Sequence, residues 1–385
     1  MSKKMSKKSI LVLNGQYLPG YKGGGPIQSC VNMIENMANE YQFYVLTGDR
    51  DFKSDEPYEN IKINQWNRVG AAKVFYMSPD KQNIKGFKRI LESIEFDILY
   101  LNGFFSPIFT IKPLILGKLG FLKGKKIILT PRGDFTGGCE NKKLKKYTYI
   151  YLCKIIGLYN NLLWHATSEL EEKDIKRKFK KAEVFTVSNL SAKYIVKEKL
   201  LEKKSGDLKL VFISRIFPKK NLKFALEILK EIKQGEILFD IYGPMEDEQY
   251  WEECKNIINK MPANVKVEYK GEVEHSEIEN IFSQYHAFLF PTLGENYGHV
   301  IVESMMAGCL LLISDTTPWR NLKEKNIGWD ISLSNSNGFK DSIKEMINMN
   351  QHDFNIKRKR LEQYVCKISN NSDDIKIYEN VFENL

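Results

Sequence analysis

Two glutamates separated by seven residues lie in the stretch FPTLGENYGHVIVESMMAGCLLLISD, residues 290–315. The pattern predicts a buried strand, a glycine-containing loop with Glu295, and a helix that carries Glu303 and ends at Gly308. Backbone N–H groups at 297–299 would have no partner within that helix and could bind phosphate or sugar oxygens. Carboxylates accept hydrogen bonds from sugar hydroxyls. The stretch therefore indicates a site for phosphate and sugar groups.

A pair of cations in SRIFPKKNL, residues 214–222, is a second candidate. Arg215 would leave the carboxyl end of a strand, and Lys220 would stand just before the next helix. Two cations beside a helix N-terminus suit a diphosphate. The spacing is common, so solvent-exposed side chains are the alternative.

A glycine run, GGGP at 23–26, follows the first predicted strand, which ends at Asn14. Glycine lets the backbone approach an anion closely, and Pro26 suits the first position of a helix. The spacing is neither GxGxxG nor a Walker P-loop, because no GK[ST] follows. The sequence is compatible with either a phosphate-binding loop or a flexible surface loop.

Strands and helices alternate through the chain, and this alternation must position the candidate residues. The expected strands are 9–14, 42–48, 73–78, 97–103, 126–133, 164–168, 183–187, 208–215, 237–243, 265–271, 287–292 and 310–315. Such alternation predicts parallel sheets covered on both faces. Because the pattern runs twice, we predict an α/β fold of two Rossmann-like domains with a cleft at the carboxyl ends of the strands, rather than a TIM barrel.

The domain boundaries follow from the break in this rhythm at 188–207, which is rich in lysine and serine. We predict an N-terminal domain over 1–190, a linker over 191–207 and a C-terminal domain over 208–360. A C-terminal helix over 361–385 would cross back and pack on the first domain.

The composition bounds the class of protein. The 385 residues carry a net charge of +10, with a pI near 9.0, and lysine-dense runs at 141–147 and 173–181. This excess of positive charge suits binding to nucleic acid, to a lipid surface or to a phosphorylated small molecule. The alternative is that the lysine runs form solvent-exposed helix faces. No apolar run is long enough to cross a bilayer and no secretory signal is evident, so we expect a cytoplasmic protein.

Metal and disulfide chemistry find little support in the sequence. The six cysteines form no CxxC pair and the histidines show no ligand spacing, so reduced thiols and no metal site are expected. Asp49-Arg50-Asp51 could suggest a metal-binding Asp-x-Asp, but its position after an early strand favours a turn.

Together these motifs resemble the retaining nucleotide-sugar glycosyltransferases of glycosyltransferase family 4, which have the GT-B fold. The resemblance rests on Glu295 and Glu303, on Arg215 and Lys220, on GGGP, and on the strand that ends with Ile241 to Gly243. The segments PRG (131–133) and HATSELE (165–171) are similar to bacterial enzymes that build surface polysaccharides.

The resemblance implies roles in the second domain. Glu303 would bind the ribose hydroxyls, and Glu295 would face the donor sugar. Arg215 and Lys220 would neutralise the leaving diphosphate, so Glu295, Arg215 and Lys220 form the implied catalytic set. The remaining implied donor contacts in this domain are backbone groups of Asn296, Tyr297 and Gly298, with Gly243 and Val273 bordering the base.

In the first domain the resemblance implies that Gly24 and Gly25 approach the same phosphates. Arg132 and His165 match first-domain motifs and are further donor-binding candidates. For His165, which follows Trp164 on an expected strand, a hydrogen-bonded structural histidine is the alternative.

The implied activity is transfer of a sugar from a nucleoside-diphosphate donor to a glycan or lipid-linked acceptor, with retention of anomeric configuration. The product would be cell-surface polysaccharide: lipopolysaccharide, capsule or exopolysaccharide. Neither a metal nor another cofactor is expected, since protein cations can stabilise the leaving group.

The acceptor would often lie at the inner face of the cytoplasmic membrane. The segment 142–158, KKLKKYTYIYLCKIIGL, could therefore lie in an anionic membrane surface or pack in the core. The alternatives for the whole chain are another GT-B enzyme, such as a nucleotide-sugar epimerase, and a basic nucleic-acid-binding protein, which lacks the expected motifs here.

Overall fold

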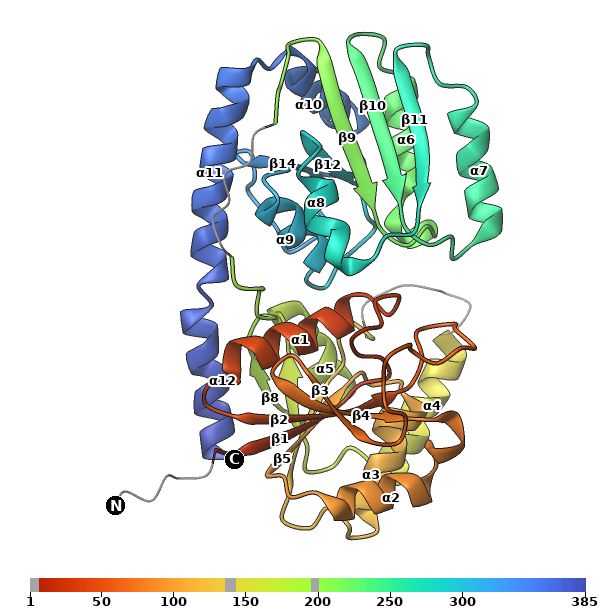
Figure 1. Ribbon diagram of the computed structural model, residues 1–385, viewed down its shortest axis with the longest axis vertical. Coiled ribbons are helices and arrows are strands. Elements are labelled where there is room, and N and C mark those ends of the chain that lie inside the picture. Colours follow the sequence, from red (N-terminus) through yellow and green to blue (C-terminus); the bar gives the residue numbers. More distant parts are fainter. Residues whose placement is uncertain (1–6, 136–142, 195–200) are drawn as a thin grey trace. The chain divides into compact units, whose positions relative to one another are not determined.

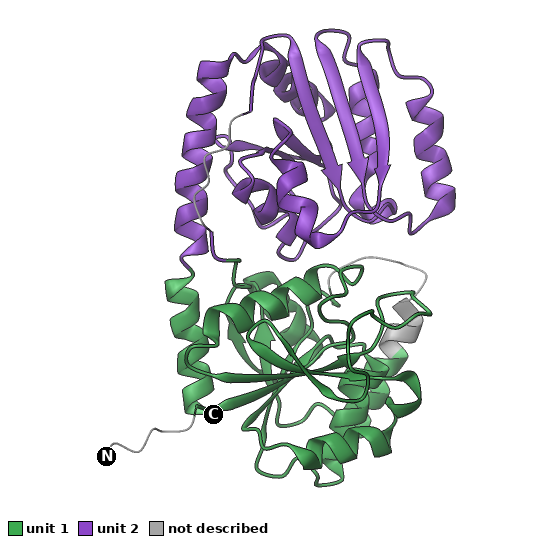
Figure 2. Cartoon of the chain, in the orientation of Figure 1, with its two compact units in different colours: residues 1–192, 371–385 green, residues 193–370 purple. Residues whose placement is uncertain are grey.

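The chain divides into two compact units, each described by itself below. The structure is a computed structural model, and it describes residues 7–135, 143–194 and 201–385 (Figure 1). Unit 1 comprises 1–192 and 371–385, and unit 2 comprises 193–370 (Figure 2). The chain passes from unit 1 to unit 2 after residue 192 and returns to unit 1 after residue 370. The sequence predicted domain boundaries at 190, 207 and 360. Residues 195–200 of the expected linker and 141–142 of a lysine-rich run lie outside the described residues.

Unit 1 is built on an eight-stranded sheet of order β3-β4-β2-β1-β5-β6-β7-β8. Its strands are β1 (Ser9–Leu13), β2 (Gln42–Gly48), β3 (Trp66–Val69), β4 (Ala72–Met77), β5 (Ile98–Asn102), β6 (Lys126–Thr130), β7 (Leu163–Ala166) and β8 (Glu183–Thr186). All neighbouring pairs are parallel except β3 and β4. Strand β3 is not among the expected strands: it pairs antiparallel with β4 through a turn at Gly70 and forms a hairpin on the sheet edge.

Unit 2 has a six-stranded, wholly parallel sheet of order β11-β10-β9-β12-β13-β14. Its strands are β9 (Asp207–Ile213), β10 (Glu236–Tyr242), β11 (Val265–Gly271), β12 (Ala287–Phe290), β13 (Leu310–Ser314) and β14 (Gly328–Ile331). Strand β14 is not among the expected strands, because it is a four-residue edge strand without a clear run of β-branched residues. Two parallel-sheet α/β units are thus present, as predicted.

Helices cover these sheets and join successive strands. In unit 1 they are α1 (Gly25–Met37), α2 (Ile84–Ser93), α3 (Lys112–Lys118), α4 (Lys143–Ile155), α5 (Glu169–Lys178) and α12 (Ser372–Asn384). In unit 2 they are α6 (Leu222–Lys230), α7 (Glu248–Ile258), α8 (Ile278–Phe282), α9 (His299–Met306), α10 (Ser336–Asn348) and α11 (Gln351–Ser369).

Strand β1 shows why both faces of the unit 1 sheet are covered. Side chains alternate between faces along a strand. Ile10 and Val12 pack in the cluster that includes α1 and α12, whereas Leu11 and Leu13 pack in the cluster that includes α2 and α3. All four residues are fully buried. A continuous apolar run is therefore what a central parallel strand requires.

The last helix, α12, belongs to unit 1. Tyr378 and Phe382 are buried in the unit 1 core, and the Tyr41 hydroxyl donates a hydrogen bond of 2.9 Å to the Glu383 carboxylate. Lys8 Nζ donates to the Phe382 carbonyl at 2.8 Å. Residues from both ends of the chain thus build one core.

Each unit contains a buried histidine held in the neutral state. His165 Nδ1 lies 2.5 Å from the Tyr100 hydroxyl, and its Nε2 lies 2.9 Å from the Val187 carbonyl oxygen. His286 Nδ1 accepts from the Lys209 amide, and its Nε2 lies 2.9 Å from a carbonyl oxygen. Since a carbonyl only accepts, both rings carry the proton on Nε2. Burial lowers the pKa of His165 to about 3 and that of His286 to about 4.

These shifts predict loss of stability in mild acid. The unfolded chain binds a proton on each histidine below about pH 6.5, whereas the folded chain does not, so stability falls as pH drops through this window. Each histidine should contribute about 1.4 kcal/mol per pH unit. Urea unfolding between pH 4.5 and 7.5 measures the slope. His286→Gln should reduce it by about one proton, and an unchanged slope would contradict this account.

Candidate active site

The candidate residues of unit 2 lie at one edge of its sheet. The order of the strands places β10 and β11 on one side of β9, and β12, β13 and β14 on the other. The loops after β9 and β12 therefore leave neighbouring strands at the point where the order reverses, which is where ligands bind in such sheets. Arg215 and Lys220 follow β9, and Glu295 follows β12. The arrowheads of β9, β10 and β11 point to the same edge (Figure 1).

An ion pair joins these two loops. Lys220 Nζ lies 2.5 Å from Glu295 Oε1, and the two side chains are only 13% and 14% exposed. The Thr292 hydroxyl donates to the same carboxylate oxygen at 3.2 Å. Lys220 Nζ also lies 5.4 Å from the centre of the Phe290 ring. A cation and a carboxylate are thus held together in a largely desolvated position.

Backbone contacts fix the same two loops. The Leu293 amide donates to the Lys219 carbonyl at 2.8 Å. Asn221, in the left-handed region at φ 59°, donates its side-chain amide to the Pro291 carbonyl at 2.9 Å. Residues about seventy positions apart in the sequence are therefore held in register by hydrogen bonds.

Helix α9 begins directly after the Glu295 loop. Its N-cap is Gly298, with a φ of 78° that favours glycine, and no side chain caps the helix. The Trp319 indole donates to the Tyr297 carbonyl at 2.6 Å, and the Tyr297 ring lies 4.8 Å from the His299 ring. Asn296, Tyr297 and Gly298 thus occupy the turn into a helix N-terminus, where phosphate and sugar oxygens find backbone donors.

Glu303 lies further along α9 and contacts a residue that was not selected from the sequence. His275 Nε2 lies 3.0 Å from Glu303 Oε1. This hydrogen bond raises the pKa of His275. Glu303 is 20% exposed and His275 is 42% exposed. The two predicted glutamates therefore have different partners: Glu295 is paired with a lysine and Glu303 with a histidine.

Arg215 forms a second ion pair, with a residue that was not predicted from the sequence. Its Nη1 lies 2.9 Å from Glu246 Oε2, and the guanidinium lies 5.0 Å from the centre of the Phe217 ring. Glu246 follows β10, the neighbour of β9. Glu246 could have been selected only by knowing that β9 and β10 are neighbours in the sheet. The alternation of strands and helices along the sequence does not give this strand order.

Gly243, at the end of β10, sits where no side chain fits. Its φ is 129°, and a Cβ at this position would lie 2.0 Å from the Ser214 carbonyl oxygen. Its carbonyl accepts from the Tyr269 hydroxyl at 3.0 Å. Val273, two residues beyond β11, is half-buried. These are the positions that the resemblance assigns to the border of the base.

The close approach at Gly243 gives a stability prediction with a matched control. Gly271 also has positive φ, 88°, but a Cβ there would meet nothing within 4 Å. Both alanine variants carry the strain of the left-handed region, but only Gly243→Ala also forces backbone atoms apart. We expect Gly243→Ala to cost about 2 kcal/mol more than Gly271→Ala. Urea unfolding measures both, and equal costs would contradict the prediction.

The candidates of unit 1 lie at the carboxyl edge of its own sheet. Gly24 is the N-cap of α1, and Gly25 is its first residue. Arg132, after β6, adopts a φ of 54°, which is costly for a residue with a side chain. Its guanidinium donates to the side chains of Asn102, Asn189 and Tyr100. The half-buried Arg132 thus fixes the loops around it within unit 1.

His165 lies inside the core of unit 1. Its side chain is fully buried, and both ring nitrogens are engaged inside unit 1. A ligand cannot reach the ring without unpacking the core. This burial favours the structural alternative for His165, and donor binding by this residue stays a prediction.

The Asp49-Arg50-Asp51 motif organises loops. Asp49 is buried and lies 2.9 Å from Arg50 Nε, whereas the Asp51 carboxylate accepts from the amides of Tyr21 and Lys22. Within residues 7–135, 143–194 and 201–385, no three His, Cys, Asp or Glu side chains form a group that could hold a metal ion.

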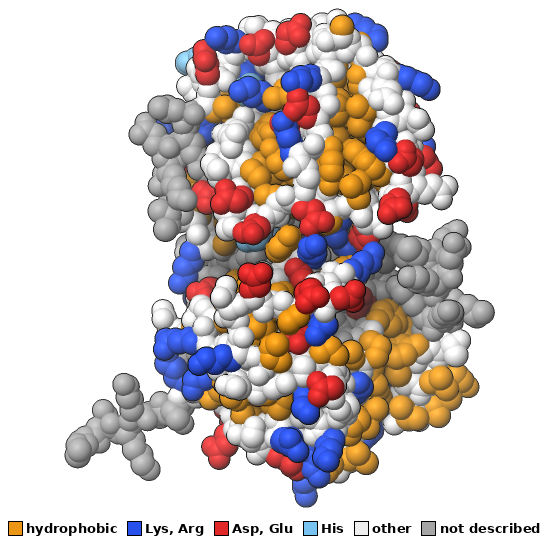
Figure 3. Space-filling model, turned by 45° about the vertical axis from the view of Figure 1, so that its right-hand side comes forward, with side chains coloured by type: hydrophobic (Ala, Val, Ile, Leu, Met, Phe, Trp, Pro, Cys, Tyr) orange, Lys and Arg blue, Asp and Glu red, His pale blue; other side chains and the backbone are white. Residues whose placement is uncertain are grey.

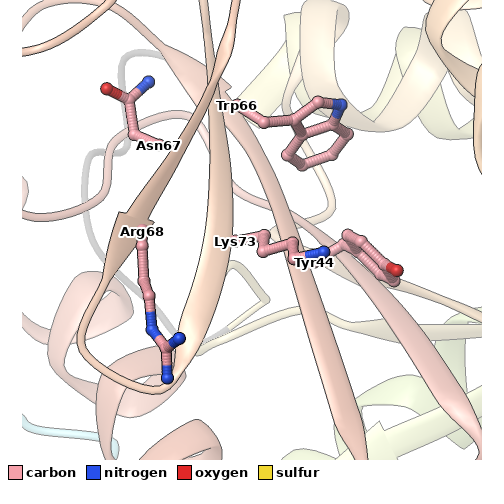
Figure 4. Close-up of a pocket in the computed structure, with 5 residues that line it drawn as sticks. All are labelled: Tyr44, Trp66, Asn67, Arg68 and Lys73. Carbon is pink, nitrogen blue, oxygen red and sulfur yellow. The ribbon is translucent and has the colours of Figure 1, made fainter.

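A separate pocket of about 330 Å³ opens on the outer strands of unit 1. Tyr44, Trp66, Asn67, Arg68 and Lys73 line it, from β2, β3 and β4 (Figure 4). None of these residues follows the carboxyl end of a central strand. The pocket is therefore distinct from the candidate residues of unit 1 described above.

The sequence comparisons match one family model and a curated relative. Residues 195–367, nearly all of unit 2, match the family model for glycosyl transferases group 1. A Klebsiella pneumoniae relative, described as an uncharacterized 41.2 kDa protein in the cps region, is 20% identical over 305 residues. This match covers 77% of the chain and 81% of the relative.

Solved structures share the whole fold. Anabaena HepE in complex with UDP and glucose aligns with a TM-score of 0.64 at 13% identity, over 98% of this chain and 100% of that one. A mutant of S. aureus TarM, in complex with fondaparinux, alpha-GlcNAc-glycerol and UDP, aligns at 0.66 and 12% identity, over 97% and 99%. The fold is that of GT-B glycosyltransferases.

Proposed function

We propose that this protein is a retaining glycosyltransferase that moves a sugar from a nucleoside-diphosphate donor to a glycan or lipid-linked acceptor. The observation that carries the proposal is the Lys220–Glu295 pair at the strand-order reversal of unit 2, beside the N-terminus of α9. A cation, a carboxylate and helix amides at one sheet edge provide groups for a diphosphate and for sugar hydroxyls.

The proposed chemistry follows from what the reaction must stabilise. The anomeric C–O bond of the donor breaks, and its electron pair stays on the departing diphosphate. The acceptor oxygen forms the new bond to the anomeric carbon, and the acceptor proton leaves with the diphosphate. Lys220 and Arg215 would offset the growing negative charge, which is the usual means of lowering such a barrier. Glu303 would hold the ribose hydroxyls and Glu295 the donor sugar.

The relatives support the substrate classes. The HepE and TarM structures both hold UDP, and that of TarM also holds glycan ligands. The cps region named for the Klebsiella relative supports a role in surface polysaccharide synthesis. We assign the acceptor to the loops of unit 1, whereas Gly24, Gly25 and Arg132 of this unit stay candidates for donor binding.

A thermal-shift screen with UDP, GDP, ADP and their sugars tests the donor class. A ligand that binds only the native state raises the melting temperature, by an amount that depends on its concentration relative to Kd. At least one nucleoside diphosphate should raise it. If none does, while tRNA or DNA binds tightly in a salt-sensitive manner, the protein is a nucleic-acid-binding protein instead.

We also propose that unit 1 contacts an anionic membrane surface at the inner face of the cytoplasmic membrane. Seven exposed large hydrophobic side chains come from α3, α4 and the residues that follow them: Ile115, Leu119, Phe121, Tyr151, Leu152, Ile155 and Ile156. We call them the α3–α4 patch. Hydrophobic side chains gather on this part of unit 1, beside the grey atoms (Figure 3). Lys118 Nζ lies 3.3 Å from where a Cβ at Gly157 would stand, so the ends of α3 and α4 are neighbours.

The positive charge around the α3–α4 patch favours an anionic membrane as its partner. Segments 112–127 and 148–161 contain six lysines and neither Asp nor Glu. Apolar side chains among lysines suit an anionic bilayer. The same helix packs in the core through Ile150 and Cys153, as the core-packing alternative expects, and the proposed membrane contact concerns only its exposed side chains. No helix in the described part of the chain is long and apolar enough to span a membrane.

Sedimentation with vesicles of phosphatidylglycerol and phosphatidylcholine tests this surface. The protein should bind at low salt, and Leu152→Glu combined with Ile155→Glu should abolish binding. Ile377→Glu, an exposed apolar position on α12, is the matched control and should bind normally. Absence of binding by the unmodified protein would overturn the membrane proposal and leave the donor assignment untouched.

A further inference from the structure

His275 connects two parts of the candidate site that are far apart in the sequence. It starts a short 3-10 turn, His275–Glu277, in the segment between β11 and α8. Its Nε2 lies 3.0 Å from Glu303 Oε1 on α9, across 28 positions of sequence. The same segment carries Val273, which the resemblance places beside the base. One imidazole thus joins the base-side segment to the carboxylate assigned to the ribose.

We infer that His275 is a positioning residue: it holds Oε1 of Glu303 so that Oε2 is presented to the ribose of the nucleotide. With the described residues, Oε2 makes no hydrogen bond. A carboxylate has two oxygens and several acceptor positions, so one oxygen can be fixed while the other accepts from hydroxyls. Without His275 the carboxylate would turn among rotamers and lose conformational entropy on binding. The inference rests on the proposed function.

The protonation state of the His275 imidazole should then affect the affinity for the nucleotide, with weaker binding when the ring is protonated. A neutral ring donates one hydrogen bond through Nε2, whereas a protonated ring forms an ion pair with Glu303 and competes with ribose hydroxyls for its charge. The group that faces His275 from α9 is Glu303, and the charged neighbours on its own segment are Glu274 and Glu277, both exposed. The bond to Glu303 raises the pKa of His275, so this competition extends toward neutral pH.

Calorimetric titration with UDP, GDP and ADP between pH 6 and 8.5 tests the inference, using the diphosphate that binds the unmodified protein most tightly. His275→Ala should weaken binding by about threefold to tenfold, the range for loss of one hydrogen bond. His275→Gln can donate to Glu303 but cannot be protonated. It should bind within about twofold of the unmodified protein at pH 8.5. Comparison of Kd values at each pH cancels the ionisation of the phosphates.

The pH dependence separates a positioning role from a merely structural one. The Kd of the unmodified protein divided by that of His275→Gln should rise as the pH falls from 8 to 6, whereas His352→Gln, an exposed histidine of α11, should show no such change. If His275→Ala and the unmodified protein have the same Kd at every pH, the inference is wrong and the proposed function stands. If no diphosphate binds the unmodified protein, both fail.

Discussion

Lys220→Ala should lower the rate of sugar transfer by about 10²–10³-fold, the expected cost of removing one preorganised group directed at developing charge. Lys220 is the least exposed cation among the predicted site residues of unit 2, and its ammonium group lies beside Glu295. In a desolvated position its charge is worth more than in water. Release of the nucleoside diphosphate from the donor found in the screen measures the rate.

Lys223→Ala is the matched control for Lys220→Ala. Lys223 lies three residues further on, pairs with Glu253 at 2.8 Å, and is 46% exposed. Exposed pairs contribute at most about 1 kcal/mol to stability, so this variant should keep its activity. A Lys220→Ala enzyme whose rate stays within about threefold of the unmodified protein would contradict the role of Lys220.

The effect of Lys220 on stability can be separated from its effect on transfer. Lys220→Ala leaves the Glu295 carboxylate with the Thr292 hydroxyl but without its cation. An unpaired, mostly buried charge costs stability, so the melting temperature should fall. Adding Glu295→Ala removes that charge and should restore part of the melting temperature. The double variant should remain as inactive as Lys220→Ala.

Glu303→Gln and Glu295→Ala should fail at different steps. Glu303→Gln replaces a charged acceptor of hydroxyls by a neutral amide, so the Kd for the nucleoside diphosphate should rise by about tenfold. Glu295→Ala removes a group assigned to the donor sugar, so turnover should fall while the diphosphate binds nearly normally. Separate measurement of kcat and KM, with direct binding of the diphosphate, distinguishes the two.

Glu253→Gln is the control for the two glutamates, because Glu253 lies on the surface of α7 and pairs with Lys223. It should bind and turn over donor as the unmodified protein does. If both Glu303→Gln and Glu295→Ala retain normal donor hydrolysis and transfer, the assignment of the site is wrong.

The alternation of apolar runs and helices predicted most of the fold, because central parallel strands must be apolar along their whole length. Residues 9–13 and 310–314 are examples, and both strands are fully or almost fully buried. Strands β3 and β14 were missed, since each has only four residues and shows no continuous apolar run.

The site was predicted as a set of residues but not as a set of contacts. Lys220 and Glu295 were both selected, yet their ion pair depends on β9 and β12 being neighbours, and strand order is not written in local sequence. Glu246 and His275 were missed for the same reason. His165 was selected from a family motif, and the structure shows it buried in unit 1 with both ring nitrogens engaged, a contact pattern that the motif does not reveal.

The return of α12 to unit 1 has a consequence for how the protein is made. The ribosome completes residues 193–370 before Tyr378 and Phe382 exist, so unit 2 has all its residues first, and the aromatic cluster around Tyr41 must wait. During that delay unit 1 exposes an apolar face that its own later residues will cover. Nascent chains stalled near residue 370 should therefore be bound by chaperones at unit 1, a vulnerability that ends once residues 371–385 are available to pack on unit 1.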